Sequence, residues 1–114
     1  MVDTFSALAD PTRRSIIQLL ANSGQLSATD ISDNFQITPP AISQHLKVLR
    51  EAQLVQVQKQ GQHRLYYINP NSMLELEQWA KQTRQRWELR FDALDILLEV
   101  EKNKLKKHKH GKSK

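Results

Sequence analysis

The sequence predicts a mainly α-helical fold with a small β component (α+β), in which several short helices precede one β-hairpin and a long last helix. Two observations predict this order. Up to about residue 52, and again from about residue 72, apolar residues recur at the three- and four-residue spacing of amphipathic helices. Between these stretches the period changes to two, because Val55 and Val57 alternate with glutamines, as is typical of a strand.

Three helix starts are marked by capping residues. Asp10 and Thr38 each precede a proline, and a cap followed by proline at the first helical position is a strong start signal. Ser27 resembles the first residue of a capping box, with Asp30 three positions later. We therefore expect helices over residues 2–8, from residue 11 to about residue 24, from residue 28 with Ile31 and Phe35 on one face, and from residue 39 to about residue 52.

The second half of the chain predicts the hairpin and the last helix. Gly61 permits a turn after the first strand, and residues 64–68 are rich in strand-forming side chains. A single long helix is predicted from about Ser72 to Leu98 or beyond. Two short helices joined by a tight turn at residues 36–38, followed by a hairpin, are the layout of a winged helix-turn-helix with a two-stranded wing.

Length and composition limit the classes of function. The 114 residues suffice for one domain with a modest core, which we expect to span residues 1–100. No apolar run approaches the roughly 18 residues of a membrane span, and the N-terminus does not resemble a signal peptide. Cysteine is absent, which excludes disulfides and thiolate metal sites and favours a cytoplasmic location.

The net charge of +5 comes from the end of the chain. Residues 102–114 hold seven lysines and no acidic residue, so the rest of the chain carries a net charge of −2. We expect residues 101–114 to form a basic, disordered tail, because like charges repel and little apolar surface is available for burial. Two roles remain open for this tail: a solubilising extension, or an electrostatic arm that contacts DNA phosphates.

The helix that begins at Pro39 has one apolar and one polar face. On a helical wheel, Ile42, Leu46 and Leu49 share a narrow arc and are expected in the core. The other side carries hydroxyl, amide and cationic groups, which suit base edges and phosphates. Because a recognition helix contacts bases mainly through its N-terminal half, the expected DNA contacts are Thr38, Pro40, Ser43, Gln44 and Lys47, with Arg50 nearer the backbone. An ordinary solvated helix face is the alternative.

His45 lies at the edge of the apolar arc, about 60° from Ile42 on the wheel. A half-buried histidine with a structural or phosphate-contacting role fits this position better than a base reader or a metal ligand does. We therefore include His45 among the DNA-contact candidates in that limited sense.

The tip of the predicted hairpin is rich in cations and hydrogen-bond donors. Residues 38–64 carry a net charge of +3, in a body whose net charge is −2. Such a tip suits phosphates or a minor-groove edge, although hairpin tips are often polar without a function. The wing residues expected to contact DNA are Lys59, Gln62, His63 and Arg64.

The last helix carries an apolar seam that is longer than a small core requires. Its members are spaced by 4, 3, 4, 4, 3 and 4 residues, which keeps them on one face over about six turns. We expect this seam to form a homodimer interface, and the alternative is a core helix that packs only within its own chain. Trp79 lies beside the seam, whose seven members are Leu76, Ala80, Thr83, Trp87, Phe91, Leu94 and Leu98, and all eight residues are interface candidates.

Three segments of the chain resemble the ArsR/SmtB-type winged-helix repressors. They are FSALADPTRR at residues 5–14, ISQHLKVLREA at residues 42–52, and the Leu-Val pair at residues 54–55. The resemblance covers about residues 4–98. It implies a dimeric winged helix in which the first and last helices form the interface, and a protein that represses transcription by occupying operators.

Two departures from the family pattern affect this interpretation. Gln53 stands where the family usually has a glycine, so a left-handed helix stop is less comfortable here. Metal-sensing members carry cysteines in the recognition region, or paired Asp/His and His/Glu on the last helix. This chain has no cysteine, and no histidine between Tyr66 and Lys107. It therefore resembles the non-metal-sensing branch, and we expect neither a metal nor another cofactor.

The function predicted from the sequence is a sequence-specific DNA-binding transcriptional regulator. We expect a repressor that binds a palindromic operator in double-stranded DNA as a homodimer, without a membrane partner and with an unidentified effector, if any. An enzyme is not expected, because no nucleophile elbow, glycine-rich phosphate loop or metal-ligand spacing is present. The alternative is a winged-helix protein-interaction module without specific DNA binding.

Overall fold

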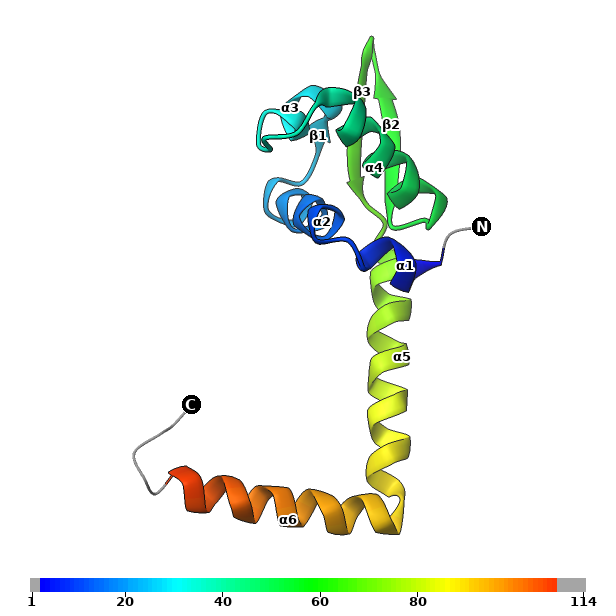
Figure 1. The fold of residues 1–114 in the computed structure, drawn as a ribbon. Coiled ribbons are helices and arrows are strands. Elements are labelled where there is room, and N and C mark those ends of the chain that lie inside the picture. The colour runs from blue at the N-terminus through cyan, green and yellow to red at the C-terminus, as the bar shows by residue number, and fades with distance from the viewer. Residues whose placement is uncertain (1–2, 109–114) are drawn as a thin grey trace. The chain divides into compact units, whose positions relative to one another are not determined.

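Helices make up most of the chain in the computed structural model (Figure 1), which describes residues 3–108, except the side chains of residues 91–94 and 106–108. The chain separates into two compact units, Met1–Leu76 and Glu77–Lys114. The elements in chain order are α1 (Thr4–Leu8), α2 (Pro11–Ser23), β1 (Leu26–Ser27), α3 (Ala28–Ser32), α4 (Pro39–Glu51), β2 (Val55–Gln60), β3 (His63–Ile68), α5 (Pro70–Leu89) and α6 (Phe91–His108). This order confirms the predicted winged helix-turn-helix layout.

The three predicted helix caps are all formed. The Asp10 carboxylate accepts a hydrogen bond from the backbone N–H of Arg13 at 3.0 Å, at the start of α2. Ser27 Oγ accepts from the Asp30 N–H at 3.1 Å, and Thr38 Oγ1 accepts from the Ala41 N–H at 3.3 Å. Each bond satisfies a backbone donor that lacks a partner within its own helix. The caps therefore fix the starts of α2, α3 and α4.

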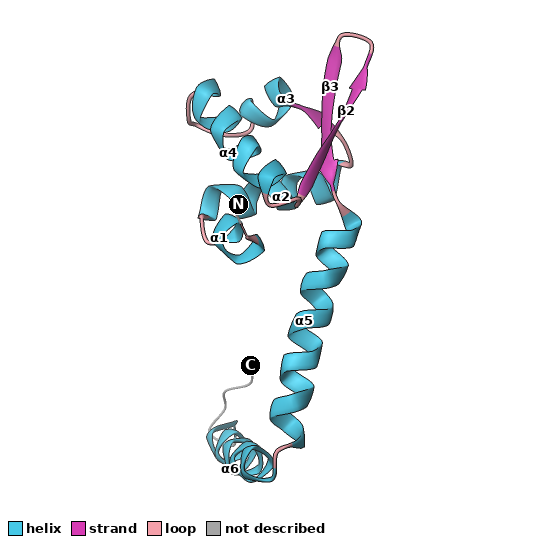
Figure 2. Cartoon of the chain, turned by 90° about the vertical axis from the view of Figure 1, so that its right-hand side faces the viewer, coloured by secondary structure: helices cyan, strands magenta, loops and turns pink. Residues whose placement is uncertain are grey.

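The sheet has one strand more than the sequence predicted. The hairpin of β2 and β3 is present, and β1 pairs with the free edge of β3, giving the antiparallel order β1-β3-β2 (Figure 2). The register places Val57 opposite Tyr66, and Gln60 opposite His63 at the tip. Gly61 occupies the turn with a φ of 64°, a conformation that glycine adopts without strain. The predicted two-stranded wing thus belongs to a three-stranded sheet.

The core of the first unit lies among α2, α3, α4 and the sheet. Ile42, Leu46 and Leu49 are fully buried, so the predicted inward face of α4 is confirmed. The other buried apolar residues are Ala7, Ile16, Leu20, Ile31, Ala52, Leu54, Val55 and Tyr66.

Helix α4 is followed, two residues after its last residue Glu51, by a residue with a left-handed backbone. Gln53 has a φ of 62°, as the glycine position of the family pattern implied. The Leu54 N–H donates to the Leu49 carbonyl and the Gln53 N–H to the Arg50 carbonyl, both at 2.9 Å, which is the Schellman arrangement. The Gln53 carbonyl accepts hydrogen bonds from Asn69 Nδ2, at 2.9 Å, and from Ser72 Oγ.

The link between α3 and α4 differs from the prediction. A tight turn was expected at residues 36–38, but α3 ends at Ser32 and residues 33–38 form the connection. Phe35 therefore lies outside the helix that was expected to carry it with Ile31. It is half-buried and packs against the core, so its burial comes from the loop rather than from a helix face.

The predicted single last helix is interrupted at Arg90. The Arg90 N–H donates to the Trp87 carbonyl, three residues back, at 3.3 Å, and this short-range bond ends α5. The chain resumes its helix as α6 at Phe91. The expected continuous seam is therefore divided between two helices.

The predicted disordered tail is partly helical, because α6 extends to His108. Lysine is a good helix former, and neither glycine nor proline interrupts the chain between Asn71 and His110. Cations also interact favourably with the C-terminal end of a helix. The boundary expected between residues 100 and 101 therefore falls inside α6, and residues 109–114 lie outside the described part of the chain. Among the described helices, none combines the length and the apolar character needed to cross a bilayer.

Candidate nucleic-acid interface

Helix α4 has the polar outer face that the sequence predicted. Ser43, Gln44, Lys47 and Arg50 are exposed, as is Pro40 in the first turn. Pro40, Gln44 and Lys47 lie opposite the buried face of the helix, and Ser43 and Arg50 lie on one flank of it, so the core does not cover their polar groups. The face therefore offers a hydroxyl, an amide and two cations to a partner.

Thr38 has a structural role at the start of this face. Its Oγ1 caps α4 by accepting from the Ala41 N–H at 3.3 Å. Because a hydroxyl has one donor and two acceptor sites, the cap leaves the hydroxyl proton available. Thr38 is also exposed, so capping and a DNA contact are chemically compatible.

The predicted wing residues lie at the end of the hairpin. Lys59, Gln62, His63 and Arg64 are all exposed, and the strand register places Lys59 directly opposite Arg64. Like charges in directly opposite positions destabilise a sheet. This pair concentrates positive charge near the tip. The hairpin extends away from the helices of its unit (Figures 1 and 2).

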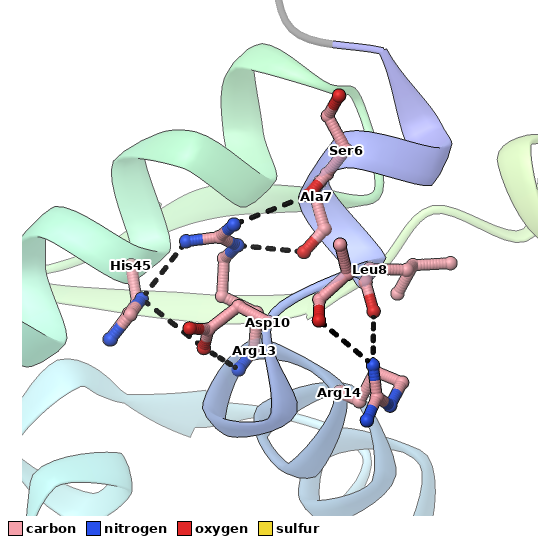
Figure 3. A network of polar contacts seen from close by, with 8 residues as sticks. Ser6, Ala7, Leu8, Asp10, Arg13, Arg14 and His45 are labelled. Atoms are coloured by element: carbon pink, nitrogen blue, oxygen red, sulfur yellow. Dashed lines mark hydrogen bonds and ion pairs between the residues drawn. The ribbon is translucent and has the colours of Figure 1, made fainter.

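His45 is directed toward α2 rather than toward the outer face of α4. Its Nδ1 lies 3.3 Å from Arg13 Nη1 and 3.9 Å from Asp10 Oδ2 (Figure 3). Nδ1 of His45 therefore makes a contact within the chain, and this nitrogen is not directed outward with the other predicted DNA-contact groups of α4.

Arg13 was not identified from the sequence, yet it connects three helices. Its Nε donates to the Ala7 carbonyl at 2.7 Å and its Nη2 to the Ser6 carbonyl at 3.3 Å, both in α1 (Figure 3). The neighbouring Arg14 donates to the carbonyls of Leu8 and Ala9 at 2.7 and 3.2 Å. In the sequence, Arg13 and Arg14 belong to the Asp-Pro-Thr-Arg-Arg segment at residues 10–14. Nothing in the spacing of that segment indicates that Arg13 contacts His45, 32 positions later.

The Asp10 carboxylate is stabilised in its charged form. The hydrogen bond from the Arg13 N–H lowers the pKa of Asp10, partial burial opposes this effect, and the nearby His45 and Arg13 side chains lower it further. The pKa of Asp3 at the start of α1 is lowered in the same way, by the N–H of Ser6. Both caps are therefore anionic at neutral pH.

A groove beside α4 contains residues that sequence reasoning missed. It encloses about 620 Å³ between the C-terminal half of α4 and the base of the hairpin. Lys47 and Arg50 line one wall, and Gln56 and Tyr67 are among the residues of the other. The two cations of α4 therefore line a groove whose other wall, at the sheet, carries both polar and apolar side chains.

The predicted interface residues are mostly accessible in a single chain. Trp87 is 43% and Leu98 54% exposed, and Trp79, Ala80 and Thr83 are also exposed, whereas Leu76 is half-buried. Phe91 and Leu94 belong to α6, but their side chains lie outside the described part. In the described part of the second unit, further exposed large apolar residues that were not predicted are Leu89, Ile96, Val100 and Leu105.

In the part of the chain that the structure describes, no three residues among His, Asp and Glu gather closely enough to hold a metal ion. Cysteine is absent from the whole sequence.

Comparisons with known proteins agree with this geometry. The model of the family described as "Bacterial regulatory protein, arsR family" matches residues 10–57. The transcriptional repressor SdpR of Bacillus subtilis (strain 168) is 37% identical over 79 residues, which cover 69% of this chain and 87% of that protein. An HTH-type transcriptional regulator of Mycobacterium tuberculosis is 40% identical over 72 residues, covering 63% of this chain and 66% of its own.

Solved structures give the same result. The ArsR-like transcriptional regulator from Rhodococcus sp. RHA1 superimposes with a TM-score of 0.72 at 25% identity, covering 82% of this chain and 87% of that one. Its fold and the sequence relatives point to one group of proteins. The chain belongs to the ArsR family of bacterial regulatory proteins and is a DNA-binding transcriptional regulator with a winged helix-turn-helix fold.

Proposed function

We propose that this regulator is a cytoplasmic repressor that binds a palindromic operator as a homodimer. One observation carries the proposal: α4 buries Ile42, Leu46 and Leu49 and exposes polar and cationic groups on its opposite side. Gln44 lies in the first half of the helix, where a recognition helix meets base edges. A glutamine amide pairs with the donor and acceptor that adenine presents in the major groove.

The cations of α4 and of the wing supply the sequence-independent part of binding. Lys47 and Arg50 follow Gln44 along α4, and Lys59 faces Arg64 at the hairpin tip. Contacts to phosphates position a protein on the duplex. Lys59 and Arg64 repel each other across the strands of the wing, and contacts to anionic phosphates would offset that repulsion.

The homodimer and the palindrome follow from one argument. Trp87 and Leu98 are large apolar side chains that are about half exposed in one chain. Full burial of such a side chain contributes roughly 1.5–3 kcal/mol, and burying the exposed half against a second copy would contribute about half of that for each. A twofold axis then repeats the recognition helix about 34 Å away, one turn of DNA, and the operator must repeat its sequence with the same symmetry.

We also propose that metals do not control this repressor. A zinc site draws about four ligands from Cys, His and carboxylates. Cysteine is absent, and of the described histidines in the first unit, His45 lies in α4 beside Arg13 whereas His63 lies in the wing. Calorimetry in which stoichiometric zinc bound tightly and changed operator affinity would overturn this part of the proposal.

A gel-shift assay with genomic fragments at about 150 mM salt tests the function directly. The unmodified protein should retard specific fragments, and the triple variant Gln44→Ala, Lys47→Ala, Arg64→Ala should lose that binding. The matched control replaces Gln78, Lys81 and Arg86, which are exposed on α5, and therefore removes the same residue types. If no fragment is retarded, or if the first triple variant folds and binds normally, the proposed surface is wrong.

A further inference from the structure

The His45 ring is held by a fixed partner at one of its two nitrogens. Arg13 Nη1 lies 3.3 Å from Nδ1. The guanidinium is itself held in place, because its Nε donates to the Ala7 carbonyl at 2.7 Å and its Nη2 to the Ser6 carbonyl at 3.3 Å (Figure 3). Arg13 therefore presents a positioned N–H to the imidazole of α4.

This contact selects one tautomer of the neutral ring. A guanidinium has five N–H donors and no acceptor, so a hydrogen bond from Arg13 requires Nδ1 to act as the acceptor. The proton of a neutral His45 then lies on Nε2. The competing partner for an Nδ1 proton is Asp10 Oδ2, but it lies 3.9 Å away, beyond hydrogen-bonding range, and already accepts from the Arg13 N–H at 3.0 Å.

The Nε2 atom points away from this cluster. Figure 3 shows the second ring nitrogen of His45 on the side opposite Arg13 and Asp10. The His45 side chain is 21% exposed, and none of the hydrogen bonds found for it involves Nε2. Among the described residues, every fully shielded side-chain nitrogen or oxygen has a partner. The Nε2–H is therefore open to solvent on the flank of α4.

We propose that Arg13 is a positioning residue that holds His45 in the Nε2–H tautomer, and that this N–H donates to a phosphate of the bound operator. A phosphate fits better than a base, because His45 lies at the edge of the buried face, whereas Gln44 and Lys47 lie on the outer side. The flanks of a helix in the major groove face the phosphate backbone. This inference rests on the proposed function, since it requires α4 to lie on DNA.

Two substitutions of His45 separate the nitrogens. His45→Asn places an amide oxygen near the position of Nδ1, so it can accept from Arg13 but does not reach the phosphate. His45→Gln reaches the position of Nε2 and can donate there. We expect the Asn variant to keep its stability and to lose about tenfold in affinity for the tightest-binding genomic fragment, whereas Gln keeps most of it. Equal affinities, or the reverse order, would overturn the phosphate contact.

The tautomer is tested without DNA. Nitrogen-15 NMR of the His45 ring at about pH 8, where free histidine is neutral, should show the proton on Nε2. Arg13→Met, which removes the donor but keeps a long side chain, should give a mixed tautomer and weaker operator binding. The control is Arg14→Met, which also removes hydrogen bonds to carbonyls near the end of α1 but does not contact His45.

The two experiments fail in distinguishable ways. A ring that carries its proton on Nδ1 in the unmodified protein, or a tautomer unchanged by Arg13→Met, overturns the role of Arg13 whatever the DNA results are. If the unmodified protein retards no genomic fragment, operator binding itself is wrong, and the phosphate contact fails with it. Normal binding by the unmodified protein and by His45→Asn rejects the phosphate contact alone.

Discussion

Asn69 donates a hydrogen bond of 2.9 Å to the carbonyl oxygen of Gln53, sixteen positions earlier in the chain. Ser72 Oγ donates to the same oxygen. These bonds join the end of α4 to the start of α5 and hold Gln53 at a φ of 62°, where a side chain is unfavourable. Hydrogen bonds from Asn69 and Ser72 thus maintain a left-handed backbone at Gln53 that glutamine itself disfavours.

The first prediction is that Gln53→Gly stabilises the protein. Glycine adopts a left-handed φ without the steric cost that Gln53 bears, and the backbone carbonyl remains available to Asn69. We expect the free energy of unfolding to rise by about 0.5–1 kcal/mol, measured by urea denaturation.

The control for this prediction is Gln58→Gly, which makes the same change at an exposed position of β2 with ordinary strand backbone. Glycine within a strand should lower the free energy of unfolding by about 0.5–1 kcal/mol. A loss of stability in Gln53→Gly similar to that of the control would contradict the prediction.

The second prediction concerns acid and the Asp10 cap. Because folding lowers the pKa of Asp10 below its ordinary value of 3.8, the carboxylate stabilises the folded state above that pH. The contribution is lost as the pH falls through the lowered pKa. Asp10→Asn keeps a capping group without the charge. We expect the unmodified protein to be more stable than this variant at pH 7, and the difference to shrink in acid.

Urea denaturation between about pH 2 and pH 7 checks the Asp10 prediction. Asp10→Ser, a second uncharged cap, should show the same pH profile as Asp10→Asn. A stability difference that stayed constant over this range would show that the charge of Asp10 is not responsible.

The third prediction separates phosphate contacts from base contacts on α4. Lys47→Ala should weaken binding to all DNA sequences and reduce the slope of log affinity against log salt by about 0.9, the value for one phosphate contact. Gln44→Ala should instead cost about 1–3 kcal/mol at the operator and relax the preference at one base pair. Lys81→Ala, an exposed lysine of α5, is the control. An unchanged salt slope in Lys47→Ala would argue against a phosphate contact at that position.

The fourth prediction concerns self-association. Trp87→Glu together with Leu98→Glu should convert the dimer into monomers. Each substitution replaces an apolar side chain, which we expect the second subunit to bury, with a charged one, and burying an unpaired charge is costly. Sedimentation at micromolar concentration measures this, and operator affinity should fall in parallel because the two half-sites are no longer linked. Gln82→Glu adds a charge at an exposed polar position of α5 and should leave the dimer intact. A monomeric unmodified protein would contradict the proposal.

Much of the first unit follows from local sequence signals. The caps at Asp10, Ser27 and Thr38 were predictable because each depends on residues within three positions. The buried face of α4 was predictable because helical periodicity assigns Ile42 and Leu46 to one side. These signals also identified the exposed polar residues of α4 and the polar hairpin tip.

The remaining features depend on contacts that periodicity does not encode. Strand β1 has only two residues, too few to show an alternating pattern, and exists because it pairs with β3. The interruption at Arg90 has no glycine or proline to mark it, and the apolar spacing continues across it. The contact between Arg13 and His45 joins positions 32 residues apart. Helical periodicity predicts which face of its helix a residue lies on, but not which residue of another helix it contacts.

Ser27 belongs to two elements at once. It is the last residue of β1, opposite Leu65 of β3, and its Oγ caps α3 through the Asp30 N–H. Inserting one residue before Ser27 would therefore shift the strand register or displace the cap from its helix. The chain at this point has a fixed length. At the tip of the hairpin, by contrast, where Gln60 pairs with His63, β2 and β3 can each lengthen or shorten by the same number of residues around the two-residue turn without changing the strand register, so variation in length among related chains should concentrate at the tip of the wing.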